Sequence, residues 1–207
     1  YFVIAVFFGF ALISFFLPVP DSIAKDILKI LEEIIKKTEG MSQFELIRFI
    51  FLNNTQSSFF GLTLGIFLGV FPILFAVFNG YVLGFVAFMA VEAAGGEVLW
   101  RLLPHGIFEL PAVFLSLGIG LRMGLPFIYR YFKYYFNKKN SLALVLGVLF
   151  LFPAIVLTLI FNKDLRKKQF EDIAFKINNS LRTFILVIIP LLIIAAIIEG
   201  SLLILGR

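Results

Sequence analysis

Three ionisable residues lie inside apolar stretches of this chain. His105 and Glu109 are four residues apart in one apolar run, and Glu199 lies near the end of the last one. An ionised carboxylate near the centre of a membrane helix costs about 2.5 to 3.5 kcal/mol, so each is a candidate functional residue. Imidazole nitrogen and carboxylate oxygen both suit a divalent transition metal, and residues four apart on one helix can supply both.

Three interpretations of these residues are open. A neutral carboxyl group hydrogen-bonded to His or Asn would only join helices. A bound cation or an exchanged proton would make the residues a functional site. A catalytic metal would need more ligands than the single histidine supplies, and Ser57 and Ser58 have no second histidine as a base. We therefore expect a protein that is not an enzyme, with a divalent metal ion as its only candidate cofactor.

The composition shows where these residues must lie. The chain has 207 residues, 61% hydrophobic and 15% charged, and its mean hydropathy is +1.03. Soluble domains have about 45 to 50% apolar and roughly 25% charged residues. Because this chain has more apolar and fewer charged residues than that, its composition excludes a soluble globular protein. Apolar runs near the ~20 residues that cross a bilayer recur, and residues 142–160 lack the alternation of a barrel strand. We expect an all-α, polytopic helical protein, with residues 1–207 forming one multi-pass domain in the cell membrane.

The apolar runs give the elements that must position the site. They cover residues 1–17, 59–78, 81–92, 105–122, 141–161 and 183–205, the last two interrupted by Pro153 and Pro190. Asn79-Gly80 is a turn signal between the second and third runs. The third run has twelve residues, or about 18 Å of helix, so it either extends through Gly95-Gly96 or is a broken helix.

The segment 21–52 is predicted to be an amphipathic helical insertion between the first two spans. Apolar residues recur at helical spacing over 21–38, with charged residues between them, which is typical of a helix outside the hydrocarbon. Such a helix lies on the membrane or contacts a partner. A second helix is predicted from Ser42 to the polar interruption at residues 53–58.

Two basic loops bear on the number of crossings. Residues 122–140 contain five Lys or Arg and no acids, and residues 162–182 contain six Lys or Arg and three acids. Six crossings would place these loops on opposite sides, against the positive-inside tendency. Five crossings, with the Pro153 run re-entrant, would place both in the cytoplasm, yet its 21 apolar residues are long enough to cross. Only the re-entrant version brings His105, Glu109 and Glu199 to one depth.

Small residues form two ladders at four-residue spacing. Gly61, Gly65 and Gly69 form one, and Ser116 and Gly120 belong to the other, on the face of His105 and Glu109. Such edges serve close helix packing within one chain or a homodimer seam. We expect a homo-oligomer, a dimer in the first instance. Further polar residues with a supporting role are Asn53, Asn54, Asn79, Glu92 and Glu97.

The expected partners are the lipid bilayer and membrane or envelope proteins. The net charge of +5 requires no nucleic acid, because the basic residues lie between apolar runs, where cytoplasmic loops and anionic headgroups account for them. Cysteine is absent, which excludes disulfides and thiolate metal sites.

Several strings of the sequence resemble the stage II sporulation protein M family. They are Asn53-Asn54 before the glycine ladder, Asn79-Gly80, Leu103-Pro104-His105-Gly106 with Glu109-Leu110-Pro111-Ala112, and residues 195–199. The resemblance covers most of the chain and implies a multi-spanning membrane protein. The family's namesake supports a septal complex that degrades peptidoglycan, contributing membrane anchorage and no hydrolysis. Members occur widely outside sporulating organisms, so the resemblance implies the positions of the polar residues and leaves that role open.

Overall fold

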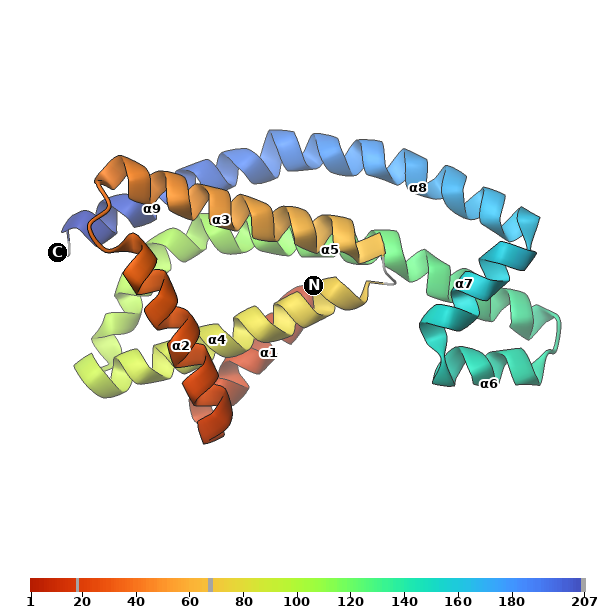
Figure 1. Cartoon of the computed structure of the whole chain (residues 1–207), viewed down its shortest axis with the longest axis horizontal. Coiled ribbons are helices and arrows are strands. Elements are labelled where there is room, and N and C mark those ends of the chain that lie inside the picture. The colour runs from red at the N-terminus through yellow and green to blue at the C-terminus, as the bar shows by residue number, and fades with distance from the viewer. Residues whose placement is uncertain (18, 67–68, 206–207) are drawn as a thin grey trace.

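The computed structural model describes residues 1–17, 19–66 and 69–205, and every regular element within these ranges is helical (Figure 1). The expected all-α class is therefore confirmed. The helices are α1 (Phe2–Phe16), α2 (Asp21–Thr38), α3 (Gln43–Thr63), η1 (Leu64–Ile66), α4 (Val70–Ala94), η2 (Gly96–Val98), α5 (Leu99–Asn137), α6 (Ser141–Leu149), α7 (Leu151–Phe161), α8 (Lys163–Thr183), η3 (Phe184–Ile188) and α9 (Ile189–Leu205).

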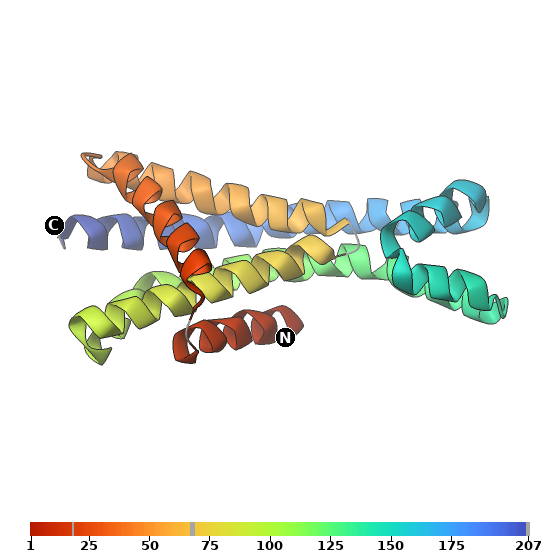
Figure 2. The ribbon, with the colours of Figure 1, turned by 60° about the horizontal axis from the view of Figure 1, so that its bottom comes forward.

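Helices α3, α5 and α9 form the centre of the bundle. Gly61 lies against Leu117 and Gly65 against the backbone of Gly120, so α3 and α5 run in the same direction. Helix α9 runs the opposite way beside α3, since the first turn of α3 meets the last turns of α9. The apolar core between the three helices consists of Leu62, Ala112, Met123, Phe184, Ile188 and Leu192. Figure 2 shows α3 and α9 side by side, with α4, α5 and α1 on the other side of the bundle.

Helices α1 and α4 form a closely packed parallel pair. The backbone of Phe7 lies against Gly80 and that of Ala11 against Gly84, so near that a Cβ on either glycine would overlap it. The predicted turn at Asn79-Gly80 is therefore wrong. Gly80 lies inside α4 because only glycine lets the α1 backbone approach so closely, and the Asn79 amide donates to the Phe75 carbonyl one turn earlier at 2.8 Å.

The predicted second and third spans are also divided differently. The polar residues 53–58 lie inside α3, and the helix breaks within the run predicted as residues 59–78. Gly69 directly precedes α4 and has a left-handed φ of 70°, which residues other than glycine rarely adopt. Helix α4 then has 25 residues, about 38 Å long, so it is neither a twelve-residue segment nor a broken one.

The amphipathic helix predicted over residues 21–38 is confirmed as α2. It leaves α1 at a bend of 110°, and Ile27 is its one buried residue. Its other isoleucines and leucines are half-buried or exposed. Helix α3 begins with the capping box that the serine at 42 suggests, because Ser42 and Glu45 bond each other's backbone N–H groups.

Helix α5 is much longer than the predicted span 105–122. Its 39 residues continue to Asn137, so nearly all of the predicted basic loop 122–140 is helical. The apolar run 141–161 is broken at Phe150 into α6 and α7, of 9 and 11 residues, each too short to cross a bilayer. Pro153 lies in the first turn of α7, where a backbone N–H would have no intrahelical acceptor, so its absence costs no helical hydrogen bond. Figure 1 shows α6 and α7 folded back beside the end of α5.

The last apolar helix adapts to Pro190 by a local change of winding. A π-helical turn, η3, joins α8 to α9 directly before Pro190, and the three elements form one continuous curved helix (Figure 1). Proline cannot donate the usual i to i−4 hydrogen bond, and a π-turn shifts the register of the preceding turn.

Three helical stretches are long and apolar enough to cross a membrane: residues 70–94, 106–137 and 163–204. The bent pair of α1 and α2 would make a fourth. The structure thus supports a helical membrane protein, but it does not confirm the expected five or six spans. Helices α1 and α3 fall outside the three because α1 has only 15 residues and α3 contains the polar stretch 53–58.

Candidate functional site

Helix α5 presents the predicted small-residue stripe to the inside of the bundle. Ala112 and Ser116 on this face have no exposed surface, and the hydroxyl of Ser116 donates to the carbonyl of Ser58 on α3. Glu109 lies one turn before Ala112. Pro111 lies inside the helix, so the carbonyl of Ile107 lacks its usual intrahelical N–H partner.

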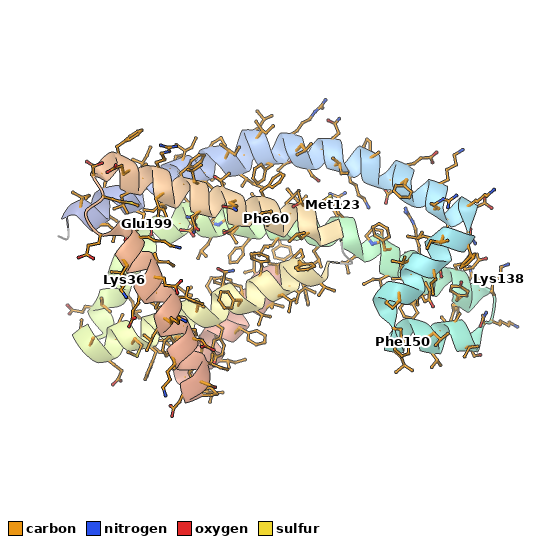
Figure 3. All side chains as sticks on the ribbon, viewed as in Figure 1. Lys36, Phe60, Met123, Lys138, Phe150 and Glu199 are labelled. Atoms are coloured by element: carbon orange, nitrogen blue, oxygen red, sulfur yellow. The ribbon has the colours of Figure 1, made fainter. Side chains whose placement is uncertain are left out.

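Glu109 and Glu199 belong to two apolar helices that pack together, Glu109 to α5 and Glu199 to α9. Both side chains are half-buried. The antiparallel packing of α5 and α9, with Ala112 and Leu192 in one core cluster, brings the start of α5 level with the end of α9. Figure 3 shows Glu199 near the end of the bundle where α3 begins and α9 ends.

The third predicted ligand cannot be added to this pair. The backbone of His105 lies in α5, four residues before Glu109, but its side chain lies outside the described residues. Among the side chains that the structure does describe, no three His, Asp or Glu residues are grouped so that they could hold a metal ion.

Helix α3 adds two buried hydroxyl groups, one to two helical turns along the bundle axis from the level of Glu109. The hydroxyls of Thr55 and Ser58 are buried and have no hydrogen-bond partner within the described part of the chain. Since Ser58 lies level with Ser116, the parallel register places Thr55 level with Val113. One helical turn, about 6 Å along the axis, separates that level from Glu109.

Most of the other predicted polar residues are exposed. Asn53 is exposed on α3, and its amide contacts the side chain of Asn54 at 3.5 Å. Asn79 bonds its own helix, as described above. Glu92 at the end of α4 and Glu97 in η2 are both exposed. The hydrogen bonds of Asn53 and Asn79 therefore stay within their own helices.

The glycine ladders are used within the chain. A Cβ on Gly65 would overlap the backbone of Gly120, and one on Gly61 would lie 2.6 Å from Leu117. Gly69, the third member, lies at the break before α4 and is not part of the helical ladder. Because α5 covers these edges, a homodimer would have to use another surface.

The sequence reasoning missed a polar cleft between α5 and α8. Its volume is about 250 Å³, and it is lined by Ile119, Arg122, Met123, Asp172, Phe175, Lys176, Asn179, Ser180 and Thr183. The signal was present in the spacing, since Asp172, Lys176 and Ser180 recur every four residues and share one face of α8. The prediction of a basic loop over residues 162–182 left this helical face out.

The comparisons with known proteins give one result. No curated protein and no solved structure matches the chain. The model of the family described as stage II sporulation protein M matches residues 1–202 of the 207, as the Leu-Pro-His-Gly and Glu-Leu-Pro strings of α5 suggested. The chain therefore belongs to the stage II sporulation protein M family.

Proposed function

We propose that this membrane protein binds a cation, either a proton or a divalent metal ion, between Glu109 and Glu199. The observation that carries the proposal is that the antiparallel packing of α5 and α9 places these two carboxyl groups, which belong to different apolar helices, at the same level of the bundle. Two ionised carboxylates at close range repel each other, and a shared proton or a bound cation removes the repulsion. In apolar surroundings this effect is larger than in water.

Neighbouring groups favour a site over an accidental contact. The buried hydroxyls of Thr55 and Ser58 are oxygen donors on the facing helix. His105 precedes Glu109 by four residues, a spacing at which one helix can supply two ligands.

The proposed topology is five crossings at the apolar runs other than 141–161, with α6 and α7 re-entrant or at the surface. The Arg130–Asp172 ion pair of 3.0 Å supports it, because it joins the two basic loops on one side of the bundle. The positive-inside tendency makes that side cytoplasmic, so α2 lies on the outer face.

A non-catalytic scaffold that recruits partner proteins is the alternative. The specific observation in its favour is the backbone contact at Gly65 with Gly120 and at Gly80 with Phe7. Contacts without intervening side chains fix the helices relative to one another and oppose the sliding that transport requires. In a scaffold, Glu109 and Glu199 would share a proton and only hold α5 to α9.

Purified Glu109→Gln and Glu199→Gln variants distinguish these functions, with Glu92→Gln as the matched control because it makes the same change at an exposed position. A cation site predicts bound metal, or proton flux in liposomes, in the wild type and in Glu92→Gln. Both pair variants should lose it. If the wild type holds no metal and conducts no cation, the scaffold is the correct function.

A double-mutant cycle adds a test of the pair itself. Direct interaction between Glu109 and Glu199 predicts a coupling energy of about 0.5 to 3 kcal/mol in unfolding experiments. Additive effects of the two substitutions would show that the carboxyl groups act independently, which contradicts a shared cation.

A further inference from the structure

The cleft between α5 and α8 is polar and cationic. Arg122 and Lys176 face it, together with the side chains of Asn179 and Thr183. Its volume of about 250 Å³ corresponds to several water molecules at ~30 Å³ each, so it accepts a group larger than a single ion. It separates α5 from α8 near Met123, which Figure 3 labels.

The one acidic residue of the cleft is already neutralised. Asp172 bonds Arg130 at 3.0 Å and Lys176 at 2.8 Å, so this group of three residues carries a net positive charge. Arg122 adds a second positive charge. It is exposed and forms no ion pair with any residue that the structure describes. The cleft therefore favours an anion.

The position of the cleft in the fold indicates which anion can reach it. Arg122 is the first charged residue of α5 after Glu109, and Thr183 directly precedes the apolar segment formed by η3 and α9. The cleft thus lies at the boundary between hydrocarbon and water, where lipid headgroups are found. Beside it, Ile185 and Leu186 are exposed by 58% and 71%, and acyl chains can cover them.

Two aromatic–cation pairs lie further along α5, seven to sixteen residues beyond Arg122. Lys133 lies over the ring of Tyr129, and Lys138 over that of Tyr134, at 5.5 and 5.4 Å. Tyrosine is enriched where membrane and water meet, and basic side chains there are attracted to anionic lipids.

We infer that the cleft binds a phosphate group, with Arg122 and Lys176 as its cationic ligands and Asn179 and Thr183 as additional polar contacts. Arginine offers a planar set of donors that matches phosphate oxygens, and lysine supplies a point charge. The membrane boundary favours the headgroup of an anionic phospholipid as the source. A soluble phosphate compound presents the same chemistry. The inference is independent of the Glu109 and Glu199 proposal.

The test measures phosphatidylglycerol bound to the purified full chain in detergent by native mass spectrometry. Arg122→Gln removes the exposed cation of the cleft, and Asn179→Trp fills the cleft without changing the charge. Arg182→Gln is the matched control, because it removes an exposed arginine of α8 that does not line the cleft. Thermal unfolding of each variant verifies that it is folded.

Retention should weaken at least about fivefold in Arg122→Gln and Asn179→Trp, and stay unchanged in Arg182→Gln. Phosphatidylcholine, which is zwitterionic, should be retained more weakly by the wild type. If Arg122→Gln instead weakens only the binding of inorganic phosphate or glycerol 3-phosphate, the phosphate site stands with a soluble source. Equal losses in Arg122→Gln and Arg182→Gln, or no dependence on Arg122 for any phosphate, would overturn it.

Discussion

The contact between α3 and α5 predicts opposite effects for two glycines of α5 that are two residues apart. A Cβ on Gly120 would overlap the carbonyl oxygen of Gly61 and lie 3.0 Å from Pro72 Cγ. A Cβ on Gly118 would meet nothing within 4 Å. Gly118→Ala and Gly120→Ala therefore make the same chemical change at an open and at a closed position of one helix.

The magnitudes follow from two opposing effects. Alanine favours a helix over glycine by about 0.8 to 1.0 kcal/mol, and this gain is common to both variants. Overpacking costs typically about 1 to 3 kcal/mol, and it applies only at Gly120, where the neighbours are backbone and a proline ring that cannot rotate away. Gly118→Ala should stabilise the protein, and Gly120→Ala should be about 1 to 3 kcal/mol less stable than Gly118→Ala.

Equilibrium unfolding in mixed detergent micelles measures the free energy of unfolding of both variants and the wild type. The comparison between variants cancels the helix-propensity gain, so the difference reports packing alone. If Gly120→Ala is as stable as Gly118→Ala, the close approach of α3 and α5 at this point is wrong.

Three further predictions concern the extension of α5, the topology and the start of α3. Tyr131→Phe removes the hydrogen bond from the buried phenol to the Ala143 carbonyl and should lower the free energy of unfolding by about 1 kcal/mol, whereas Tyr129→Phe at an exposed site should have little effect. Single cysteines at Asn137 and Lys167 should react with an impermeant reagent from the same side of the membrane, and a single cysteine at Glu39 from the other side. If the cysteines at Asn137 and Lys167 are labelled from opposite sides, the re-entrant arrangement is wrong. Bonds from the backbone and hydroxyl of Ser42 lower the pKa of Glu45, so its contribution to helix capping is present above the ordinary value of 4.5 and is lost as the pH falls through the lowered pKa. Hydrogen exchange at the first turn of α3 should rise on acidification in the wild type and be insensitive to pH in Glu45→Gln.

Much of the fold was predictable because it depends on local patterns. The apolar and charged spacing of residues 21–38 defines α2 in any surroundings, and Ser42 with Glu45 defines the start of α3. The errors have one origin. Asn79-Gly80 and the polar stretch 53–58 were predicted to interrupt helices, yet both are helical. In the folded chain α1 packs on Gly80 and α5 packs on Ser58.

The candidate site shows the same division. The sequence identified Glu109 and Glu199 as unusual, since a carboxyl group in an apolar helix is costly wherever it lies. It could not bring them together, because their relative position depends on the antiparallel packing of α5 against α9. The cleft around Arg122 was missed altogether, because it exists only where α8 and α5 separate.

The sequence by itself determined the environment and the class of this protein: too few charges to solvate a surface, helical apolar runs, and the strings of the stage II sporulation protein M family. These properties depend on composition and on neighbours within a few turns. The tertiary structure alone decided which glycines are contacts and which are breaks, where the long helices end, and which charges meet. Those features depend on helices from distant parts of the chain lying side by side, and a periodic pattern within one helix carries no information about its partner.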